Sequence, residues 1–136
     1  MISITVTNDN FDSINWEGGC FKYCVFEKFE IEGKHIDRDF IDCTFTDIDW
    51  YWGLFNLVNF VGCKFNNCTF RGSSFPECKF VECEFHNCNF IKDNLNGDCS
   101  FENARAYNCV ANSCSGLNIP IWLTNSSSGR AKGACR

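Results

Sequence analysis

Large apolar residues recur at every fifth position through the middle of the chain. Between residues 40 and 95 this column has twelve consecutive members, namely Phe40, Phe45, Trp50, Phe55, Phe60, Phe65, Phe70, Phe75, Phe80, Phe85, Phe90 and Leu95. One face of a helix repeats about every 3.6 residues and one face of a strand every 2. A period of five matches neither element, so the pattern predicts a repeat architecture.

A second column lies two residues before the first and holds small side chains. Its members are Cys43, Cys63, Cys68, Ser73, Cys78, Cys83 and Cys88. The unit reads Cys-x-Phe-x-x, as in the five residues from Cys63 to Asn67. One small and one large inward residue, with three polar residues outward, predict a short extended edge followed by a corner.

This unit resembles the repeat of the pentapeptide-repeat family, whose members carry a small residue at position i−2 and Leu or Phe at the central position i. The resemblance covers residues from about 9 to 123. It implies an all-β, right-handed quadrilateral β-helix with four repeats in each coil, and about six coils for this length. It also implies a mostly non-catalytic protein, because members of the family bind DNA gyrase or topoisomerase IV as mimics of B-form DNA, or act as bacterial immunity proteins that neutralise a toxin.

The frame extends in both directions with one slip on each side. Ile36 and Phe40 are four residues apart, and Leu95 and Phe101 are six apart. We expect both slips at the same corner, and no extended loop. The predicted stacks are one of Phe21, Phe40, Phe60, Phe80, Phe101 and Ile121, and one of Phe26, Phe45, Phe65, Phe85 and Ala106.

Three segments follow from this frame. Residues 1–8 alternate apolar and polar side chains and predict a strand that caps the open end of the stack. Residues 9–123 predict the β-helix, with Pro120 and Trp122 at its end. Residues 124–136 are rich in Asn, Ser, Gly and Ala and predict a disordered tail.

The chain has 12 cysteines, which leaves disulfides, a metal site, catalysis or packing as their roles. Most occupy the slot that Ser73 and Ala104 also occupy, which favours packing of a small apolar side chain. Free thiols indicate a reducing compartment, so we expect a cytoplasmic protein. Paired C-x₂-C spacings of zinc sites are absent from the sequence, so no metal is expected.

Nothing in the sequence predicts an enzyme. His35 and His86 fall on different sides of the expected β-helix, and no glycine-rich phosphate loop is present. We therefore expect neither catalysis nor a cofactor. The formal net charge of −5 argues against direct nucleic-acid binding, and no apolar run approaches the ~18 residues of a membrane span.

The charge is unevenly distributed. Residues 1–50 contain eleven acidic and four basic residues, and residues 51–136 contain six and eight. This acidic half either keeps the protein soluble or attracts a basic partner. The carboxylates that we predict to bind a partner are Asp37, Asp39, Asp42, Asp47 and Asp49.

Two apolar surfaces are predicted beside these carboxylates. Tyr51, Trp52, Leu54 and Leu57 fall on outward positions, and exposed aromatic residues are typical of interaction hot spots. A stripe of Ile41, Val61, Val81 and Trp122 is expected along one side, either as an oligomer or partner surface or as a product of strand propensity.

The leading hypothesis is a small, cytoplasmic, bacterial immunity protein that binds a toxin through its acidic and aromatic surface. One alternative is a DNA-mimicking binder of gyrase or topoisomerase IV, and another is a structural self-assembly module. The expected partner is a basic toxin domain or a nucleic-acid-binding enzyme, and the stripe would allow a homodimer.

Overall fold

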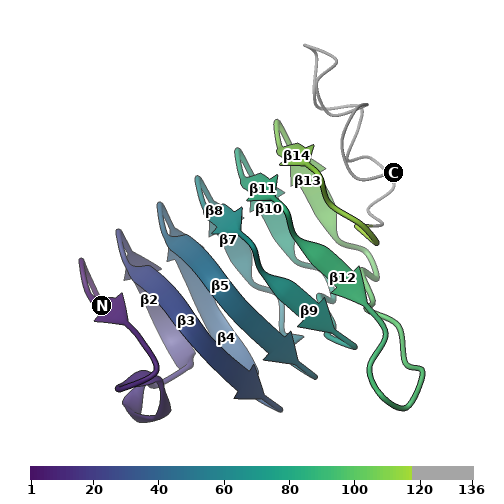
Figure 1. The fold of residues 1–136 in the computed structure, drawn as a ribbon. Helices are drawn as coiled ribbons and strands as arrows, with labels where there is room; N and C mark the ends of the chain where they lie inside the picture. Colours follow the sequence, from purple (N-terminus) through teal and green to yellow (C-terminus); the bar gives the residue numbers. More distant parts are fainter. Residues whose placement is uncertain (118–136) are drawn as a thin grey trace.

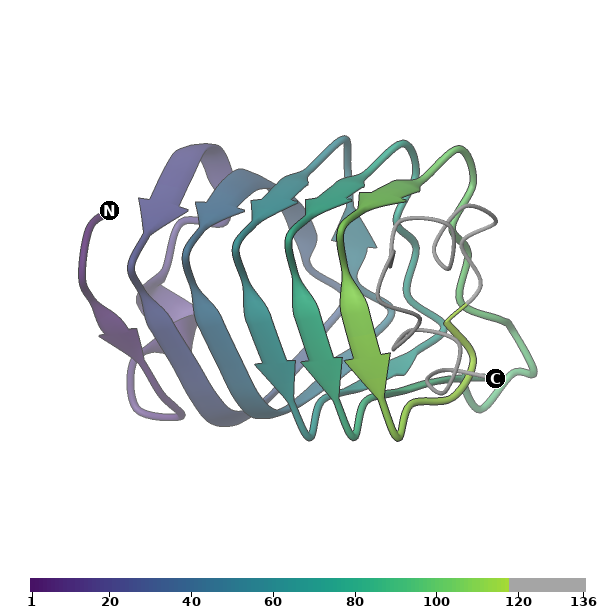
Figure 2. The ribbon, with the colours of Figure 1, turned by 90° about the horizontal axis from the view of Figure 1, so that it is seen from above.

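The chain winds into a stack of short parallel strands, seen from two directions in Figures 1 and 2. The computed structural model describes residues 1–117. Its elements are β1 (Thr5–Val6), the 3₁₀ turn η1 (Phe11–Ser13), β2 (Glu17–Lys22), β3 (Val25–Glu32), β4 (His35–Ile41), β5 (Thr44–Tyr51), β6 (Leu54–Phe55), β7 (Asn59–Val61), β8 (Lys64–Asn66), β9 (Thr69–Arg71), β10 (Lys79–Val81), β11 (Glu84–His86), β12 (Asn89–Ile91), β13 (Arg105–Tyr107) and β14 (Val110–Asn112). The predicted all-β solenoid is confirmed.

Four columns of buried side chains give the solenoid four sides, and we name each side after one of its members. The Phe55 side stacks Ile36, Phe55, Phe75 and Phe101, and the Phe60 side stacks Phe21, Phe40, Phe60, Phe80 and Ala106. The Phe65 side stacks Val6, Phe26, Phe45, Phe65, Phe85 and Ala111, and the Phe70 side stacks Ile31, Trp50, Phe70 and Phe90. The columns are in register because the strands pair in parallel.

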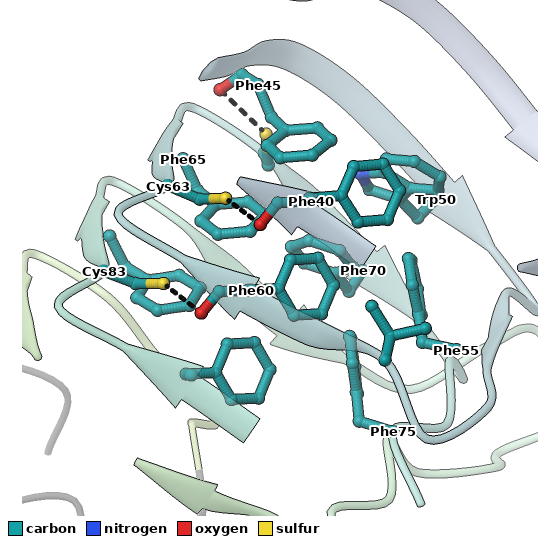
Figure 3. Close-up of a cluster of buried hydrophobic side chains, with 14 of the residues drawn as sticks. Phe40, Phe45, Trp50, Phe55, Phe60, Cys63, Phe65, Phe70, Phe75 and Cys83 are labelled. Atoms are coloured by element: carbon teal, nitrogen blue, oxygen red, sulfur yellow. Dashed lines mark hydrogen bonds between the residues drawn. The ribbon is translucent and has the colours of Figure 1, made fainter. Parts of the chain in front are cut away.

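Aromatic rings fill the core as nearly parallel stacks (Figure 3). The centroids of Phe65 and Phe85 are 4.6 Å apart with a 2° interplanar angle, and those of Phe60 and Phe80 are 4.9 Å apart, also at 2°. Rings of neighbouring sides meet edge to face, as Phe60 meets Phe65 at 65°. Such contacts add stabilisation beyond plain burial.

The predicted stacks are correct up to Phe80 and Phe85 and wrong beyond them. Phe101 stacks on Phe75, with centroids 5.1 Å apart, and Ala106 pairs with Phe80. Leu95, predicted in the core, is 78% exposed. The reason is that residues 92–99 leave the coil as a projecting loop, so the expectation of no extended loop is also wrong. Ile121 lies outside the described residues.

The other slip lies at a different corner from the loop. Between Ile36 and Phe40, β4 runs on without turning, while the paired strand β2 takes up extra residues at Gly18 and Gly19. Both glycines have positive φ, at 78° and 87°, which side chains rarely tolerate. The expectation of a shared corner is therefore wrong.

Arg38 occupies the core beside this bulge. Its Nη1 donates to the Asn15 carbonyl at 2.6 Å and its Nη2 to the Cys20 carbonyl at 3.2 Å. The guanidinium carbon lies 4.1 Å from the centre of the Phe21 ring. Arg38 thus takes the i−2 slot that a small residue occupies in later coils.

The cysteines at i−2 are packed and hydrogen-bonded. Cys63 donates its S–H to the Phe40 carbonyl at 3.2 Å, and Cys83 to the Phe60 carbonyl at 3.3 Å (Figure 3). Ser73 makes the equivalent bond to Trp50. Burial raises the pKa of Cys78 to about 12. The eleven cysteines among the described residues are free thiols, which fits the packing role.

Candidate partner-binding surface

The five predicted carboxylates are distributed around the rod. Asp37 lies on the Phe55 side, Asp39 on the Phe60 side and Asp49 on the Phe70 side. Asp42 and Asp47 occupy the corners on either edge of the Phe65 side, both with positive φ. The acidic half is therefore not one continuous face.

Two of these carboxylates have contacts inside the fold. Asp39 Oδ1 accepts the backbone N–H of Asn59 at 2.9 Å. The Asp42 carboxylate lies over Gly62, where a Cβ would collide with it. Gly62 also has a positive φ of 64°. Asp39 and Asp42 thus help to join one coil to the next.

A hollow in the surface brings two of the five, Asp47 and Asp49, together. This acidic groove, of about 600 Å³, lies along the Phe70 side and its corner with the Phe65 side. Its lining residues are Asn8, Lys28, Phe29, Glu30, Asp47, Ile48, Asp49, Asn67 and Thr69. Asp47 and Asp49 were predicted as site residues. Glu30 belongs to the acidic half of the sequence, but only the register between the coils shows that it lies beside Asp49.

The register places like charges opposite each other. Glu30 of β3 pairs directly with Asp49 of β5. Opposed like charges on neighbouring strands are destabilising. Arg71 Nε lies 3.2 Å from Asp49 Oδ1 and partly compensates, whereas the Glu30 carboxylate has no ion pair or side-chain hydrogen bond within residues 1–117. Lys28 also lines the groove, opposite Asp47, so the charge that stays without an opposing cation there is that of Glu30.

Tyr51 and Trp52 were expected to be free, exposed aromatic side chains, but both make contacts inside the fold. Both are half-buried, and their rings meet edge to face with centroids 4.4 Å apart. Trp52 Nε1 donates to Asp93 Oδ2 at 2.6 Å, and Tyr51 Oη accepts the N–H of Asn94 at 2.9 Å. The two side chains hold the 92–99 loop against the rod.

Asp93 organises this loop from within. Its Oδ1 accepts the backbone N–H groups of Leu95 and Gly97, both at 2.8 Å. These bonds and that from Trp52 hold the pKa of Asp93 below its ordinary value, the Gly97 amide contributing most. The result is a hydrogen-bonded loop that keeps Leu95 in solvent.

The remaining predicted apolar residues lie on or next to the Phe55 side. Leu54 is 39% exposed and stands in register between His35 and Ser74. Leu57, at the following corner, is 56% exposed. Both are open to contact, as expected from their outward positions.

The predicted stripe forms on the Phe60 side. Ile41 pairs with Val61 and Val61 with Val81, and all three are half-buried. The next member is Tyr107, because the loop adds residues before this coil. Trp122, the last predicted member of the stripe, lies outside the described residues.

Each of the two histidines lies on the surface near a glutamate, His35 near Glu17 and His86 near Glu84. His86 Nε2 lies 3.1 Å from Glu84 Oε1, on the surface of the rod. Within residues 1–117, no group of three or more His, Cys, Asp or Glu side chains is arranged to hold a metal ion. No helix in this same range has the length and hydrophobicity to cross a membrane.

Comparisons with known proteins agree with this fold. Residues 55–92 match the family model of pentapeptide repeats, with eight copies. No curated protein sequence matches the chain. Two structures of trypsin-treated QnrB1, a plasmid-mediated fluoroquinolone resistance protein, superpose with TM-scores of 0.63 and 0.64.

The likeness to QnrB1 is one of fold. Sequence identity is 14% and 16%, and the matches cover 85% and 84% of this chain. They cover 56% of each QnrB1 chain, so this chain spans little more than half the length of that protein. The repeat match confirms the resemblance seen in the sequence for residues 55–92, and the superpositions show that the fold is shared.

Proposed function

We propose that this chain is an immunity-type binding protein that takes a basic segment of a protein toxin into the acidic groove. Its pentapeptide-repeat fold fits a protein-interaction module. The observation that supports the binding of a basic toxin segment is the Glu30–Asp49 pair within a groove of about 600 Å³.

The groove suits an arginine or lysine side chain on physical grounds. A cation between Glu30 and Asp49 would relieve the repulsion between opposed carboxylates. Phe29 and Ile48, 4% and 1% exposed, form an apolar floor. Charges above an apolar floor are less screened than charges surrounded by water. The same field would steer a basic partner toward this side of the rod.

Apolar contacts would supplement the charges. Leu95 is held out by the hydrogen-bonded loop, while Leu54 lies on the Phe55 side and Leu57 at the following corner, and all three are exposed. A side chain on an ordered loop loses little conformational freedom when it enters a partner's pocket. Leu54 and Leu57 remain predicted contact residues together with Asp37, Tyr51 and Trp52, and the exposure of Leu95 adds it to them.

The test uses a short oligo-arginine peptide as a probe in titration calorimetry at low ionic strength. Glu30→Gln combined with Asp47→Asn removes two charges from the groove, and Glu77→Gln with Glu102→Gln removes two charges elsewhere. We expect the groove pair to weaken binding about fivefold and the control pair to have little effect. Equal weakening by both pairs would show attraction by overall charge alone and contradict the groove.

A second candidate is the DNA-mimicking binder of gyrase or topoisomerase IV. The observation that favours it is the shared fold with QnrB1. Protection of purified gyrase from a fluoroquinolone in a supercoiling assay would support this candidate. Neutralisation of a basic toxin domain, without any effect on gyrase, would support the immunity function.

Self-assembly is tested separately. The stripe of Ile41, Val61 and Val81 would bring two copies side by side. A change of Val61→Asp should reduce the solution mass if this surface forms a dimer, and an unchanged mass would remove the stripe from consideration.

A further inference from the structure

The N-terminal end of the solenoid is an open strand edge. One edge of β1 pairs with β3, through Thr5 with Val25 and Val6 with Phe26. Within residues 1–117, no strand pairs with the other edge of β1. An open parallel edge presents backbone N–H and C=O groups to any chain that can pair with it.

The bridge between Ile2 and Lys22 shows how one residue satisfies such an edge. Lys22 donates its N–H to the Met1 carbonyl and accepts the N–H of Ser3, both at 2.9 Å. The backbone N–H and C=O of one residue thus bond the carbonyl before Ile2 and the N–H after it. This is the parallel pattern that joins neighbouring coils.

The side chain of Asn10 makes the same two bonds around Val6. Its Nδ2 donates to the Thr5 carbonyl at 3.0 Å, and its Oδ1 accepts the N–H of Thr7 at 2.7 Å. Because the Thr7 N–H can bond only to the oxygen, these partners fix the orientation of the amide. A carboxamide offers one donor and one acceptor, as the backbone of a residue does, so it can replace the two bonds that a paired residue would make.

The local turn holds Asn10 in this position. The N–H groups of Asn10 and Phe11 both donate to the Thr7 carbonyl, at 3.2 and 3.0 Å. The Phe11 ring stacks on Phe29 at 5.0 Å with a 6° interplanar angle. The turn is therefore tied to the core and brings the carboxamide back over the edge.

We propose that Asn10 makes the two hydrogen bonds that the backbone of one paired residue would make, and prevents this edge from pairing with the same edge of a second copy of this chain. Two copies of one edge are self-complementary about a twofold axis. Met1, Ile2 and Tyr23, at this same end of the rod, are 45%, 65% and 59% exposed. Burial of these apolar side chains would favour the paired form once the edge is open.

The experiment compares Asn10→Ala with wild type and with Asp9→Ala, an exposed neighbour in the same turn. Hydrogen exchange reports the Thr7 amide, and sedimentation velocity over a range of concentrations reports mass. In Asn10→Ala we expect the Thr7 amide to exchange about tenfold faster or more and a dimer to grow with concentration. The wild type and Asp9→Ala should keep the slow amide and one mass.

A second variant keeps the test decisive if Asn10→Ala folds poorly. Asn10→Asp retains the acceptor for the Thr7 N–H but lacks the donor for the Thr5 carbonyl. We expect a protected Thr7 amide with dimerisation weaker than in Asn10→Ala. Unchanged exchange and mass in Asn10→Ala would overturn the proposal, and so would chains longer than a dimer, because these require head-to-tail contact.

Discussion

The coils before residue 52 and the coils after it differ in the length of their strands and in the side chains at their inward i−2 positions. After it, strands β7 to β12 are three residues long, and the i−2 slots mostly hold Cys or Ser, bonded to a carbonyl of the preceding coil. Before it, β3, β4 and β5 span seven or eight residues. Some of the i−2 slots there hold larger side chains, namely Phe29, Arg38 and Ile48, whereas Cys24 and Cys43 keep the small thiol.

The comparison shows that the i−2 slot has two ways of being filled. A small thiol or hydroxyl leaves room for a sharp corner and satisfies a carbonyl. A large side chain fills the volume through its own contacts, as Phe29 does against Phe11 and Arg38 does against Phe21. The family match over residues 55–92 lies within the first arrangement.

The largest effect is expected from a ring in the regular coils. Phe65→Ala removes a fully buried ring between Phe45 and Phe85 and should lower the free energy of unfolding by about 3–5 kcal/mol. Phe11→Ala, at the half-buried turn, should lower the free energy of unfolding by less than half of this amount. Chemical denaturation measures both, and a silent Phe65→Ala would show that this residue does not face inward.

A smaller effect is expected in the thiol slot. Cys63→Ser keeps a donor for the Phe40 carbonyl, whereas Cys63→Ala leaves that carbonyl without its side-chain donor. We expect the alanine variant to lose about 1 kcal/mol more than the serine variant. If both variants melt alike in denaturant, the S–H bond contributes nothing and only volume matters.

The reactivity of the cysteines should differ between the interior of the solenoid and its two ends. Burial raises the pKa of Cys78 to about 12 and also raises the pKa values of Cys83 and Cys99, so these three thiols stay protonated at pH 8. Among the described cysteines, the half-buried Cys20 and Cys114 should therefore be alkylated by iodoacetamide before Cys78. Mass spectrometry of timed digests measures the order, and early labelling of Cys78 would contradict the packing.

The smallest effect concerns the loop. Because the pKa of Asp93 is depressed in the fold, its stabilisation of the loop is present above the ordinary carboxyl value of 3.8 and is lost as pH falls through the lower, folded value. Trp52 fluorescence should change over this acidic range. Asp93→Asn should remove the transition, and a transition that persists would belong to another group.

These cases also explain how far the sequence alone could lead. A period of five identifies the core because the same residue type returns to the same slot, so Phe60, Phe65 and Phe80 could be placed without a structure. Leu95 occurs at the fifth position as well, yet it belongs to a loop. Side-chain bonds from Trp52 and Asp93 stabilise that loop, and a periodic pattern carries no information about them.

The acidic groove was only partly predictable for a related reason. Glu30 and Asp49 are 19 residues apart, and whether they meet depends on the four-residue step between Ile36 and Phe40. A count of charges by sequence segment places all the early carboxylates together. The structure instead distributes them over several sides and gathers Glu30, Asp47 and Asp49 at one groove.

The most direct test of the account is a map of backbone amide shifts while oligo-arginine is added to the isotopically labelled protein. Binding in the groove predicts that the largest shifts fall on Glu30, Asp49, Asn67 and Thr69, with small shifts along Ile41, Val61 and Val81. Shifts spread evenly around all four sides, or concentrated on the Phe60 side, would contradict the assignment of the acidic groove as the binding surface.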